Sequence, residues 1–364
     1  MPQVTVNLPG RSYNIIVEVG CITRAGSLIK EAGLTGKAAV ISDENVARHY
    51  SEEVRASLEA VGFEVSCHLI PAGESSKSME QAQSLCRSLI EHQHDRGSFV
   101  VALGGGVVGD LAGFVAAIFY RGIPFVQIPT TIVAQVDSSV GGKTGVNVPE
   151  GKNLLGAFQQ PRLVLADPGV LRTLPHNVFC EGFAEVIKHA SIRDASMLSE
   201  LETMDPQNQE VSPELIAANL AIKARIVEED EKETSGARAL LNFGHTIGHA
   251  IEATAEYGTL LHGEAISLGV RAALYLSERE AGLSQEETNR LLTIHRRWHL
   301  PLQLELDIST ESIMAALTRD KKFTSGQIRF VLLKALGEAF LSTEVTSTDL
   351  GEAIEHLRLP PALA

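Results

Sequence analysis

Residues 99–110 read Phe-Val-Val-Ala-Leu-Gly-Gly-Gly-Val-Val-Gly-Asp, an apolar run that ends in a cluster of glycines. Gly104, Gly106 and Gly109 have the G-x-G-x-x-G spacing that joins a strand to a helix in dinucleotide-binding domains. Glycine at these positions lets the backbone approach a pyrophosphate closely at the N-terminus of the helix. Because glycines also serve tight turns that bind nothing, the stretch predicts a strand, a turn and a helix, and leaves the ligand open.

The acidic residue that usually completes this pattern is not at its usual distance. About 20 residues beyond the glycines, where an acidic side chain would bind a ribose hydroxyl, the chain has Pro129, Thr130 and Thr131. Asp43 follows another apolar run and has Asn45 close by, so it is the alternative acidic candidate.

Outward from this stretch, short apolar runs alternate with helical stretches. Strands are predicted over 4–8, 13–19, 38–42, 65–70, 98–103, 125–128 and 163–166, the first two as an antiparallel pair, and helices over 52–61 and 79–92. After about Pro168 most stretches are helical, except for a late strand over 327–333. The sequence therefore predicts an α/β, Rossmann-like N-terminal domain over residues 1–170 and a mainly α-helical C-terminal domain over 171–364. We expect the active site in the cleft between them.

Composition and charge argue against nucleic-acid and membrane partners. The 364 residues carry a formal net charge of −14, which argues against non-specific binding to nucleic acid. The four cysteines have no short spacing, so we expect buried thiols in a reducing compartment. The first residues lack the pattern of a signal peptide, and the apolar run 111–119 is far shorter than the ~18 residues that span a bilayer. We therefore expect a soluble cytoplasmic protein without nucleic-acid or membrane partners.

A group of histidines predicts a divalent-metal site. His245 and His249 are four residues apart and would share one helix face, and His262 follows in a loop or in the next helix. Two imidazoles and a carboxylate suit Zn²⁺ and leave one position open for substrate. Glu185 is the best candidate for the carboxylate, with Lys188 on the same predicted helix face. The spacing alone leaves His249 open as a ligand.

Cationic side chains gather in two glycine-rich segments that we expect to be loops, 137–147 and 151–153. Lys143 and Lys152 in these segments, together with backbone amides, could hold phosphate or carboxylate. Further cationic candidates are Arg121, Lys188, Lys223, Arg238, Lys321 and Lys322. Such a set suits a small substrate with two or more negative charges.

Taken together, these motifs resemble those of the 3-dehydroquinate synthase family, within the sugar phosphate cyclases, over essentially the whole chain. The matching segments are 104–110, 121–122, 129–131, 137–147, 151–153, 181–188, 242–245, His249, 262–264 and 320–322. The resemblance implies a phosphate-eliminating carbon–oxygen lyase of the shikimate pathway, which leads to chorismate and the aromatic amino acids. It would convert 3-deoxy-D-arabino-heptulosonate 7-phosphate to 3-dehydroquinate by transient oxidation with NAD, phosphate elimination, re-reduction, ring opening and aldol closure. The resemblance also implies Zn²⁺ or Co²⁺ and a homodimer.

The same resemblance assigns roles to individual residues. The metal ligands would be Glu185, His245 and His262, whereas His249 would lie beside the substrate and handle a proton. The other substrate contacts would be Arg121, Asp137, Lys143, Lys152, Asn153, Lys188, Lys223, Arg238, Asn242 and one of Lys321 and Lys322, with Lys322 preferred. NAD would contact Asp43, Asn45, Gly73, Glu74, Lys77, Gly105, Gly106, Val107, Val108, Gly109, Asp110, Thr130, Thr131, Lys143, Lys152, Leu171 and Thr173.

Three alternatives stay open at this point. A sister cyclase would act on sedoheptulose 7-phosphate or glucose 6-phosphate, which lack a carboxylate, and the presence of both Arg238 and Asn242 disfavours it. A metal-dependent polyol dehydrogenase would not need the lysine set. A non-catalytic nucleotide-binding or scaffold protein would need neither the metal motif nor the lysines.

Overall fold

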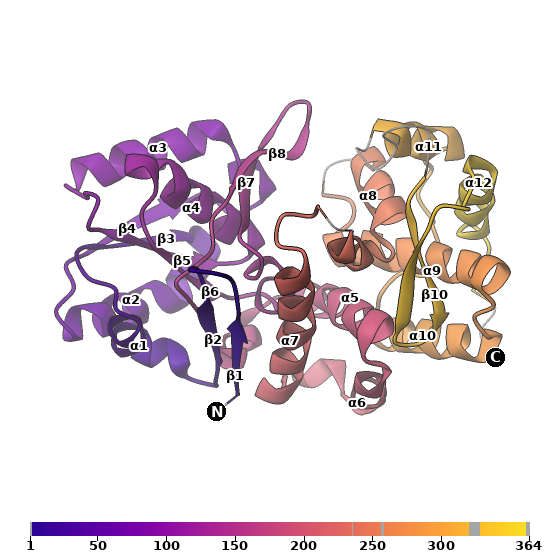
Figure 1. The fold of residues 1–364 in the computed structure, drawn as a ribbon, viewed down its shortest axis with the longest axis horizontal. Helices are drawn as coiled ribbons and strands as arrows, with labels where there is room; N and C mark the ends of the chain where they lie inside the picture. The colour runs from indigo at the N-terminus through magenta and orange to yellow at the C-terminus, as the bar shows by residue number, and fades with distance from the viewer. Residues whose placement is uncertain (1, 235, 256–257, 320–327, 362–364) are drawn as a thin grey trace. The chain divides into compact units, whose positions relative to one another are not determined.

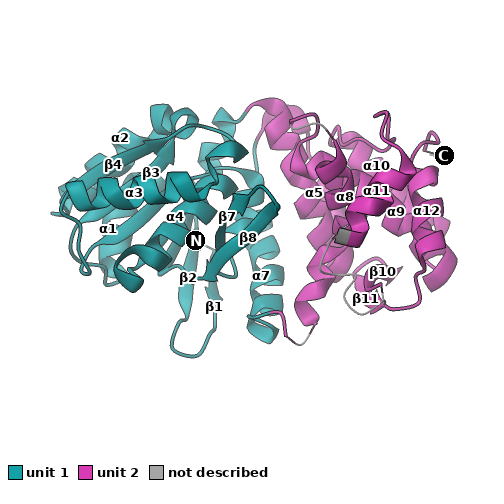
Figure 2. Cartoon of the chain, turned by 90° about the horizontal axis from the view of Figure 1, so that it is seen from above, with its two compact units in different colours: residues 1–174, 210–232 teal, residues 175–209, 233–364 magenta. Residues whose placement is uncertain are grey.

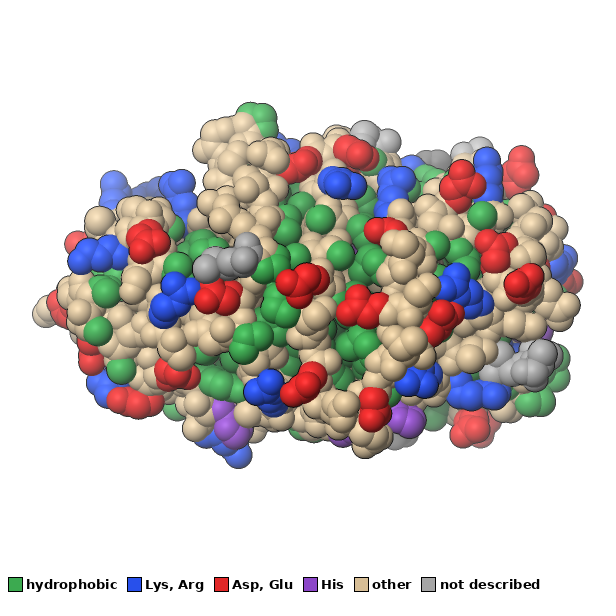
Figure 3. Space-filling model, turned by 90° about the horizontal axis from the view of Figure 1, so that it is seen from below, with side chains coloured by type: hydrophobic (Ala, Val, Ile, Leu, Met, Phe, Trp, Pro, Cys, Tyr) green, Lys and Arg blue, Asp and Glu red, His purple; other side chains and the backbone are tan. Residues whose placement is uncertain are grey.

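The structure is a computed structural model that describes residues 2–234, 236–255, 258–319 and 328–361 (Figure 1). The chain forms two compact units, one of residues 1–174 and 210–232, the other of residues 175–209 and 233–364 (Figure 2). No helix among the described residues has the length and apolarity that crossing a membrane requires. On the face drawn in Figure 3, acidic and basic side chains are interspersed rather than separated into patches of one sign.

The first unit is built on a seven-stranded sheet with the order β1-β2-β9-β6-β5-β3-β4. Its strands are β1 (Gln3–Val6), β2 (Tyr13–Val17), β3 (Ala38–Asp43), β4 (Val65–Ile70), β5 (Phe99–Gly104), β6 (Phe125–Pro129) and β9 (Leu163–Ala166). Only β1 runs antiparallel to its neighbour, and the other strands of the sheet pair in parallel. All seven predicted strands are confirmed, because each apolar run is one strand long and is bounded by turn residues.

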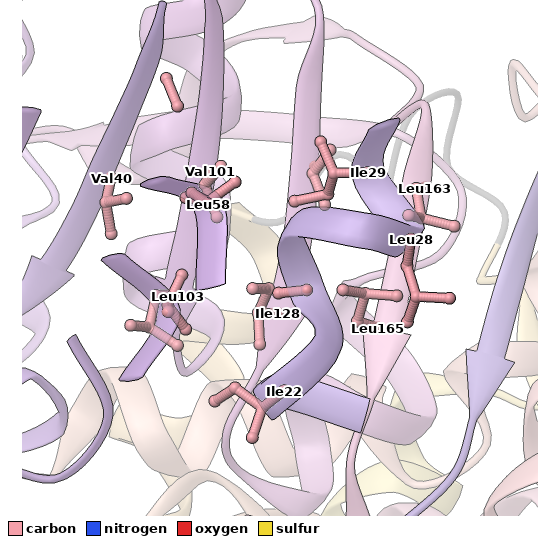
Figure 4. Close-up of a cluster of buried hydrophobic side chains, with 14 of the residues drawn as sticks. Ile22, Leu28, Ile29, Val40, Leu58, Val101, Leu103, Ile128, Leu163 and Leu165 are labelled. Atoms are coloured by element: carbon pink, nitrogen blue, oxygen red, sulfur yellow. The ribbon is translucent and has the colours of Figure 1, made fainter. Parts of the chain in front are cut away.

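Helices cover both faces of this sheet. Figure 1 shows α1 (Ala25–Glu31) and α2 (Glu44–Ala60) on one face and α3 (Met79–Glu91) and α4 (Gly106–Ile118) on the other. Leu28 and Leu58 on the first pair of helices pack with Val101 and Leu165 of the sheet (Figure 4). Strands buried on both faces read as continuous apolar runs, which explains why the sheet was visible in the sequence.

Strand order reverses between β3 and β5. From β3 the chain continues to β4 on one side, whereas β5 lies on the other side of β3 and continues to β6. The segments that leave β3 and β5 therefore diverge at the carboxyl ends of these strands. Open α/β sheets bind ligands at this position, which is called the crevice below. The glycine cluster of residues 104–106 lies at this crevice.

The predicted loops around Lys143 and Lys152 are wrong in part. The strands β7 (Lys143–Val148) and β8 (Gly151–Phe158) form an antiparallel hairpin beside α4. Gly145 pairs with Gly156 across it, and a β-carbon on Gly145 would lie 2.6 Å from the carbonyl oxygen of Leu155. These glycines therefore permit close strand approach, whereas the sequence analysis interpreted them as signs of a loop.

The segment 210–232 joins the first unit through α7 (Pro213–Glu229), which packs against β1 and β2. The backbone N–H of Asn7 donates a hydrogen bond to Glu228 (2.5 Å). The sequence analysis assigned this segment to residues 171–364, and the structure groups it by its contacts with residues 1–174. The assignment of NAD, metal and substrate binding to separate domains stays a prediction, as does the cleft.

The second unit is mainly helical, as predicted. It contains α5 (His176–Arg193), α6 (Leu198–Thr203), α8 (His245–Thr254), α9 (His262–Ala281), α10 (Gln285–Arg297), α11 (Thr310–Arg319) and α12 (Ser347–His356). The late strand is confirmed as β10 (Phe330–Ala335), although Gln327 lies outside the described residues. Its partner β11 (Glu338–Ser342) was not predicted, because Glu and Ala at its start favour helix over strand.

Short helical turns complete the described chain. They are η1 (Cys21–Arg24), η2 (Glu74–Ser76), η3 (Phe119–Arg121), η4 (Ala134–Ser138), η5 (Pro168–Thr173), η6 (Ala195–Met197), η7 (Pro206–Asn208) and η8 (Ala237–Asn242). Several of them carry predicted site residues.

Candidate active site

The crevice of the first unit gathers residues from three strand ends. Ser42 of β3 pairs with Leu103 of β5, so Asp43 follows beside Gly104. Gly104 in turn pairs with Pro129 of β6, and the N–H of Thr130 donates to the carbonyl oxygen of Gly104 (3.0 Å). Parallel strands in register thus bring together three segments that are distant in sequence.

The glycines hold α4 close to the sheet and leave its N-terminus bare. Gly105 is the N-cap of α4 and supplies no side-chain hydrogen bond. A β-carbon on Gly105 would lie 3.1 Å from Thr131 Cγ2, and one on Gly109 would lie 2.7 Å from Gln127 Oε1 on β6. The first N–H groups of a helix need an acceptor, so an anion such as a pyrophosphate fits this position.

Two polar side chains at the crevice fit a nucleotide in different ways. The hydroxyl of Thr130 is buried and has no hydrogen-bond partner, as expected of a group that awaits a ligand. Asp43 is already the N-cap of α2, where its Oδ1 accepts hydrogen bonds from the N–H groups of Asn45 (2.8 Å) and Val46 (3.1 Å). Capping fixes the carboxylate of Asp43 at the strand end, beside the exposed Asn45.

The segment after β4 connects with α4 and with the hairpin. Lys77 is buried and pairs with Asp110 in the first turns of α4 (2.5 Å between Nζ and Oδ2). Glu74 accepts a hydrogen bond from the side chain of Asn147 on β7 (2.7 Å). Gly73, with φ of 105°, begins this turn in a conformation that favours glycine.

The other predicted residues of the first unit lie on the hairpin, on η3, on η4 and on α7. Lys143, Lys152 and Asn153 are exposed on the hairpin. Asp137 accepts hydrogen bonds from buried Lys223 through Oδ1 and through its carbonyl oxygen (2.6 Å each). Arg121 is exposed in the left-handed conformation, with φ of 69°.

The remaining predicted cofactor contacts of the first unit differ in access, and Thr173 is exposed. The side chains of Val108 and Leu171 are buried in the apolar core, so only their backbone atoms could contact a ligand. Thr173 exchanges a hydrogen bond with Tyr50 (2.8 Å). Val107 is half-buried in the first turn of α4.

Three helices of the second unit converge on the predicted metal ligands. Glu185 on α5 is fully buried, and its Oε1 lies 3.3 Å from His245 Nε2 and 3.5 Å from His262 Nε2. Neither carboxylate oxygen of Glu185 makes a hydrogen bond of regular geometry, although Lys188 contacts Oε2. A buried carboxylate and two imidazole nitrogens directed at one point suit a divalent metal such as Zn²⁺.

The outer nitrogens of both imidazoles have acceptors. His245 Nδ1 lies 3.1 Å from the carbonyl oxygen of Phe243, and His262 Nδ1 lies 3.4 Å from Glu252 Oε2. Such acceptors hold the Nδ1 proton and direct the Nε2 lone pair inward, as in known metal sites. The distinguishing feature is that both Nε2 atoms lie near the same buried carboxylate oxygen, Glu185 Oε1.

Burial and neighbouring charges shift the pKa values of Glu185, His245 and His262 in different directions. Burial alone would raise the pKa of Glu185, but Lys188 and His245 lower it well below the usual range. Burial lowers the pKa of His245 and keeps its ring neutral. Burial also disfavours the charged form of His262, but Glu185 and Glu252 outweigh this and raise its pKa to about 10. A metal would therefore have to displace a proton from His262.

His249 lies beside this cluster. Its ring centre is 5.0 Å from that of His245 and 5.7 Å from that of His262, and ligand nitrogens of the three residues lie within 4.8 Å of one another. The side chain is half-buried, whereas that of His245 is buried. The structure thus brings together all four predicted residues, and the division between ligand and proton-handling residue stays a prediction.

Glycines next to the histidines set the spacing of the helices. A β-carbon on Gly269 of α9 would collide with the carbonyl oxygen of Gly244, and one on Gly248 would lie 2.9 Å from that of Ala265. A β-carbon on Gly263 would collide with the carbonyl oxygen of Glu181 on α5. The backbones of α5, α8 and α9 thus approach directly, which brings the predicted metal ligands close together.

Two side chains that support the site were given no role in the sequence analysis, although Glu181 was expected on the same helix face as Glu185 and Lys188. Glu181 Oε2 accepts a hydrogen bond from the N–H of Gly263 (2.7 Å) and fixes the start of α9, and burial raises its pKa to about 7. Glu252 supports His262 as described above. The sequence did contain a signal for Glu252. It lies three residues after His249 on the same helix face, so its carboxylate could also face His262.

The last predicted substrate contacts lie on η8 or beyond the described residues. Arg238 is buried there, with Nε 3.3 Å from Glu233 Oε1, and Asn242 is half-buried at the end of η8. Lys321 and Lys322 lie outside the described residues.

Solved structures of other proteins resemble this chain over nearly its whole length. The chain is similar to 2-deoxy-scyllo-inosose synthase in complex with carbaglucose-6-phosphate, NAD⁺ and Co²⁺ (25% identical, TM-score 0.87, 97% of this chain and 99% of that one). It is also similar to the 2-epi-5-epi-valiolone synthase of Streptomyces hygroscopicus subsp. jinggangensis with NAD⁺ and Zn²⁺ bound (28%, TM-score 0.87, 95% and 96%). The fold is that of the sugar phosphate cyclases.

Sequence relatives define the family within that class. Residues 67–181 match the family model for the 3-dehydroquinate synthase N-terminal domain, and residues 182–323 match that for the C-terminal domain. The 3-dehydroquinate synthase of Pelobacter propionicus is 46% identical over 342 residues, which cover 93% of this chain and 95% of the relative. The chain belongs to the 3-dehydroquinate synthase family.

Proposed function

We propose that this protein converts 3-deoxy-D-arabino-heptulosonate 7-phosphate to 3-dehydroquinate and phosphate, with NAD and a divalent metal, Zn²⁺ or Co²⁺. The observation that carries the proposal is the convergence of Glu185 Oε1 with the Nε2 atoms of His245 and His262, in a chain of this family. In this reaction class, NAD accepts and returns a hydride, and the metal polarises a substrate hydroxyl.

Glu185, His245 and His262 would hold the metal. The acceptors at Nδ1 of His245 and His262 support this role, because they orient the Nε2 atoms toward Glu185. His249 would hold or move a proton at the substrate, because it lies next to the ligands and is less buried than His245.

The bare N-terminus of α4 would bind the pyrophosphate of NAD. Asp43 would accept a hydrogen bond from a ribose hydroxyl, in the place of the acidic residue that the usual pattern has further along the chain. Capping by Asp43 employs Oδ1 in the described contacts, and Oδ2 is the oxygen proposed to accept from the ribose.

The cationic residues would bind the two acidic ends of the substrate. Lys143, Lys152 and Arg121 would bind its phosphate, and Arg238 or Lys223 its carboxylate. We also propose a cytoplasmic homodimer without nucleic-acid or membrane partners. The net charge of −14 supports the absence of nucleic-acid partners, and the homodimer rests on the family resemblance alone.

The second candidate function is that of a sister cyclase. It is favoured by the TM-score of 0.87 to two such enzymes, at lower identity than to the 3-dehydroquinate synthase above. Their substrates lack the carboxylate that Arg238 is proposed to bind, and the presence of both Arg238 and Asn242 disfavours this function.

The test is phosphate release from the heptulosonate phosphate with catalytic NAD⁺ and Zn²⁺, with and without a chelator. We expect release that the chelator abolishes, formation of 3-dehydroquinate and no net NADH. Release from sedoheptulose 7-phosphate alone would assign the protein to the sister cyclases. Net NADH from a simple polyol would assign it to the dehydrogenases.

A further inference from the structure

Asn147 on β7 joins three segments of the first unit. Its side-chain Nδ2 donates to Glu74 Oε1 (2.7 Å), and its Oδ1 accepts from the N–H of Asn153 (2.9 Å). Its backbone N–H donates to the carbonyl oxygen of Lys77 (2.8 Å). One residue thus connects the segment after β4 with both strands of the hairpin.

The register of the hairpin explains how Asn147 can make these bonds. Val146 pairs with Leu155 and Val148 with Gly151, with a shift of register between the two pairs. Asn147 lies at this irregularity and bridges instead to Ser78, outside the hairpin. Bulges of this kind redirect a side chain out of the regular ladder, often beside an active site.

Asn147 also holds the backbone of the proposed phosphate-binding segment. Asn153 has a φ of 58°, a left-handed conformation that is uncommon for residues other than glycine. The bond from its N–H to Asn147 Oδ1 stabilises this conformation, which orients Asn153 and its neighbour Lys152. Such conformations persist where surrounding contacts fix them.

On its other side, Asn147 reaches toward the proposed nucleotide site. Lys77, whose carbonyl oxygen it contacts, pairs through its side chain with Asp110 on α4. A continuous series of polar contacts therefore runs from Asn153 through Asn147 to Glu74, Lys77 and Asp110, and so to the helix that begins at the glycine turn.

We infer that Asn147 is a positioning residue that couples the two binding functions of the first unit. By holding the Lys152–Asn153 segment on the Glu74–Lys77 segment, it makes NAD strengthen the binding of the phosphate group, and phosphate strengthen the binding of NAD by the same factor. The inference rests on the proposed function, because it takes the residues on either side of Asn147 as the NAD and phosphate contacts.

The test measures this factor directly. The dissociation constant of inorganic phosphate is determined by calorimetry on the metal-loaded protein with and without saturating NAD⁺. We expect a ratio of at least about 5 in the wild type, within the usual range of coupling, and a ratio near 1 in Asn147→Ala. We also expect Asn147→Ala to raise the substrate KM by about 10-fold while kcat changes less, because a loosened phosphate site weakens binding first. Asn14→Ala, an exposed change on β2, is the matched control and should leave the ratio at the wild-type value.

Two further variants distinguish a loss of coupling from a loss of folding. Asn147→Asp places a carboxylate against Glu74 and should lose the coupling, although it keeps the acceptor for Asn153. Combining it with Glu74→Gln restores one donor and one acceptor and should recover the coupling in part. This comparison decides the matter even if Asn147→Ala fails to fold.

The outcomes distinguish the inference from the function on which it rests. A wild-type ratio near 1, a folded Asn147→Ala with the wild-type ratio, or a double exchange no better than Asn147→Asp alone would overturn the inference, while turnover by the wild type would leave the function standing. A wild type that neither binds NAD⁺ nor turns over the substrate would overturn both.

Discussion

The two candidate sites of this protein differ in whether backbone or side-chain groups form them. The crevice of the first unit consists largely of backbone: the bare start of α4 at Gly105 and the strand ends at Gly104 and Thr130. The candidate metal site of the second unit consists of side chains, Glu185 and His245 among them, that come from separate helices. A backbone site depends on local conformation, whereas a side-chain site depends on how distant segments pack. The two sites should therefore respond differently to the same kinds of perturbation.

The largest effect should follow from Glu185→Gln. Loss of the buried carboxylate should weaken metal binding by more than about 100-fold, beyond the usual effect of an outer contact, and abolish turnover, while NAD⁺ affinity stays within about twofold. Metal content by atomic emission and NAD⁺ titration by calorimetry measure both sites in one preparation. Glu185→Asp is the control that keeps the charge, and it should retain part of the metal. Full metal content in folded Glu185→Gln would contradict the assigned ligand set.

Glu252→Gln should have a smaller effect at the same site. It weakens the acceptor of His262 Nδ1 and should lower metal affinity by about 10- to 100-fold without removing a ligand. Competition with a chelator of known affinity measures the change. An affinity equal to that of the wild type would mean that Glu252 is only a neighbour of His262.

The pH dependence should separate the two sites further. Because the pKa of His262 is raised to about 10 in the metal-free protein, its ring is protonated at neutral pH, and a metal must displace that proton. Metal affinity should therefore rise by about 10-fold per pH unit between pH 6.5 and 9. NAD⁺ affinity should stay nearly constant over this range, since no histidine is among its proposed contacts. If metal affinity and NAD⁺ affinity changed equally with pH, the two sites would not be independent.

The smallest effect should come from Gly105→Ala in the crevice. The added methyl group meets Thr131 Cγ2 at 3.1 Å and separates the backbone from the pyrophosphate, so NAD⁺ affinity should fall by about 10-fold or less. Metal affinity should not change. Gly97→Ala is the matched control, because its β-carbon meets only Asp95 Oδ1 at an ordinary 3.4 Å. A loss of metal rather than of NAD⁺ in Gly105→Ala would show that the two sites are not separable.

The same contrast explains what could be predicted from the sequence. The strand before the glycines was predicted to within one residue, and the turn and helix after it were predicted without bounds, because apolar pattern and glycine spacing are local signals. The shared helix face of His245 and His249 was visible for the same reason and is confirmed by α8.

What the sequence could not reveal depends on contacts between distant segments. The support of His262 by Glu252 requires the turn between α8 and α9, and the place of Glu181 requires α5 to lie against the start of α9. The hairpin β7–β8 was missed because glycine occurs both in loops and in closely packed strands. At Gly145 it permits close strand approach, whereas in most sequences a glycine-rich stretch marks a loop.

The glycines between α8 and α9 have a practical consequence for engineering. Since Gly244, Gly248 and Gly269 space these helices by backbone contact, a larger residue at any of them would wedge the helices apart and separate His245 from His262. A library designed to alter substrate preference should therefore leave the three glycines fixed and randomise side chains such as Arg238 and Asn242. Variants from such a library should keep their metal while their choice of sugar changes.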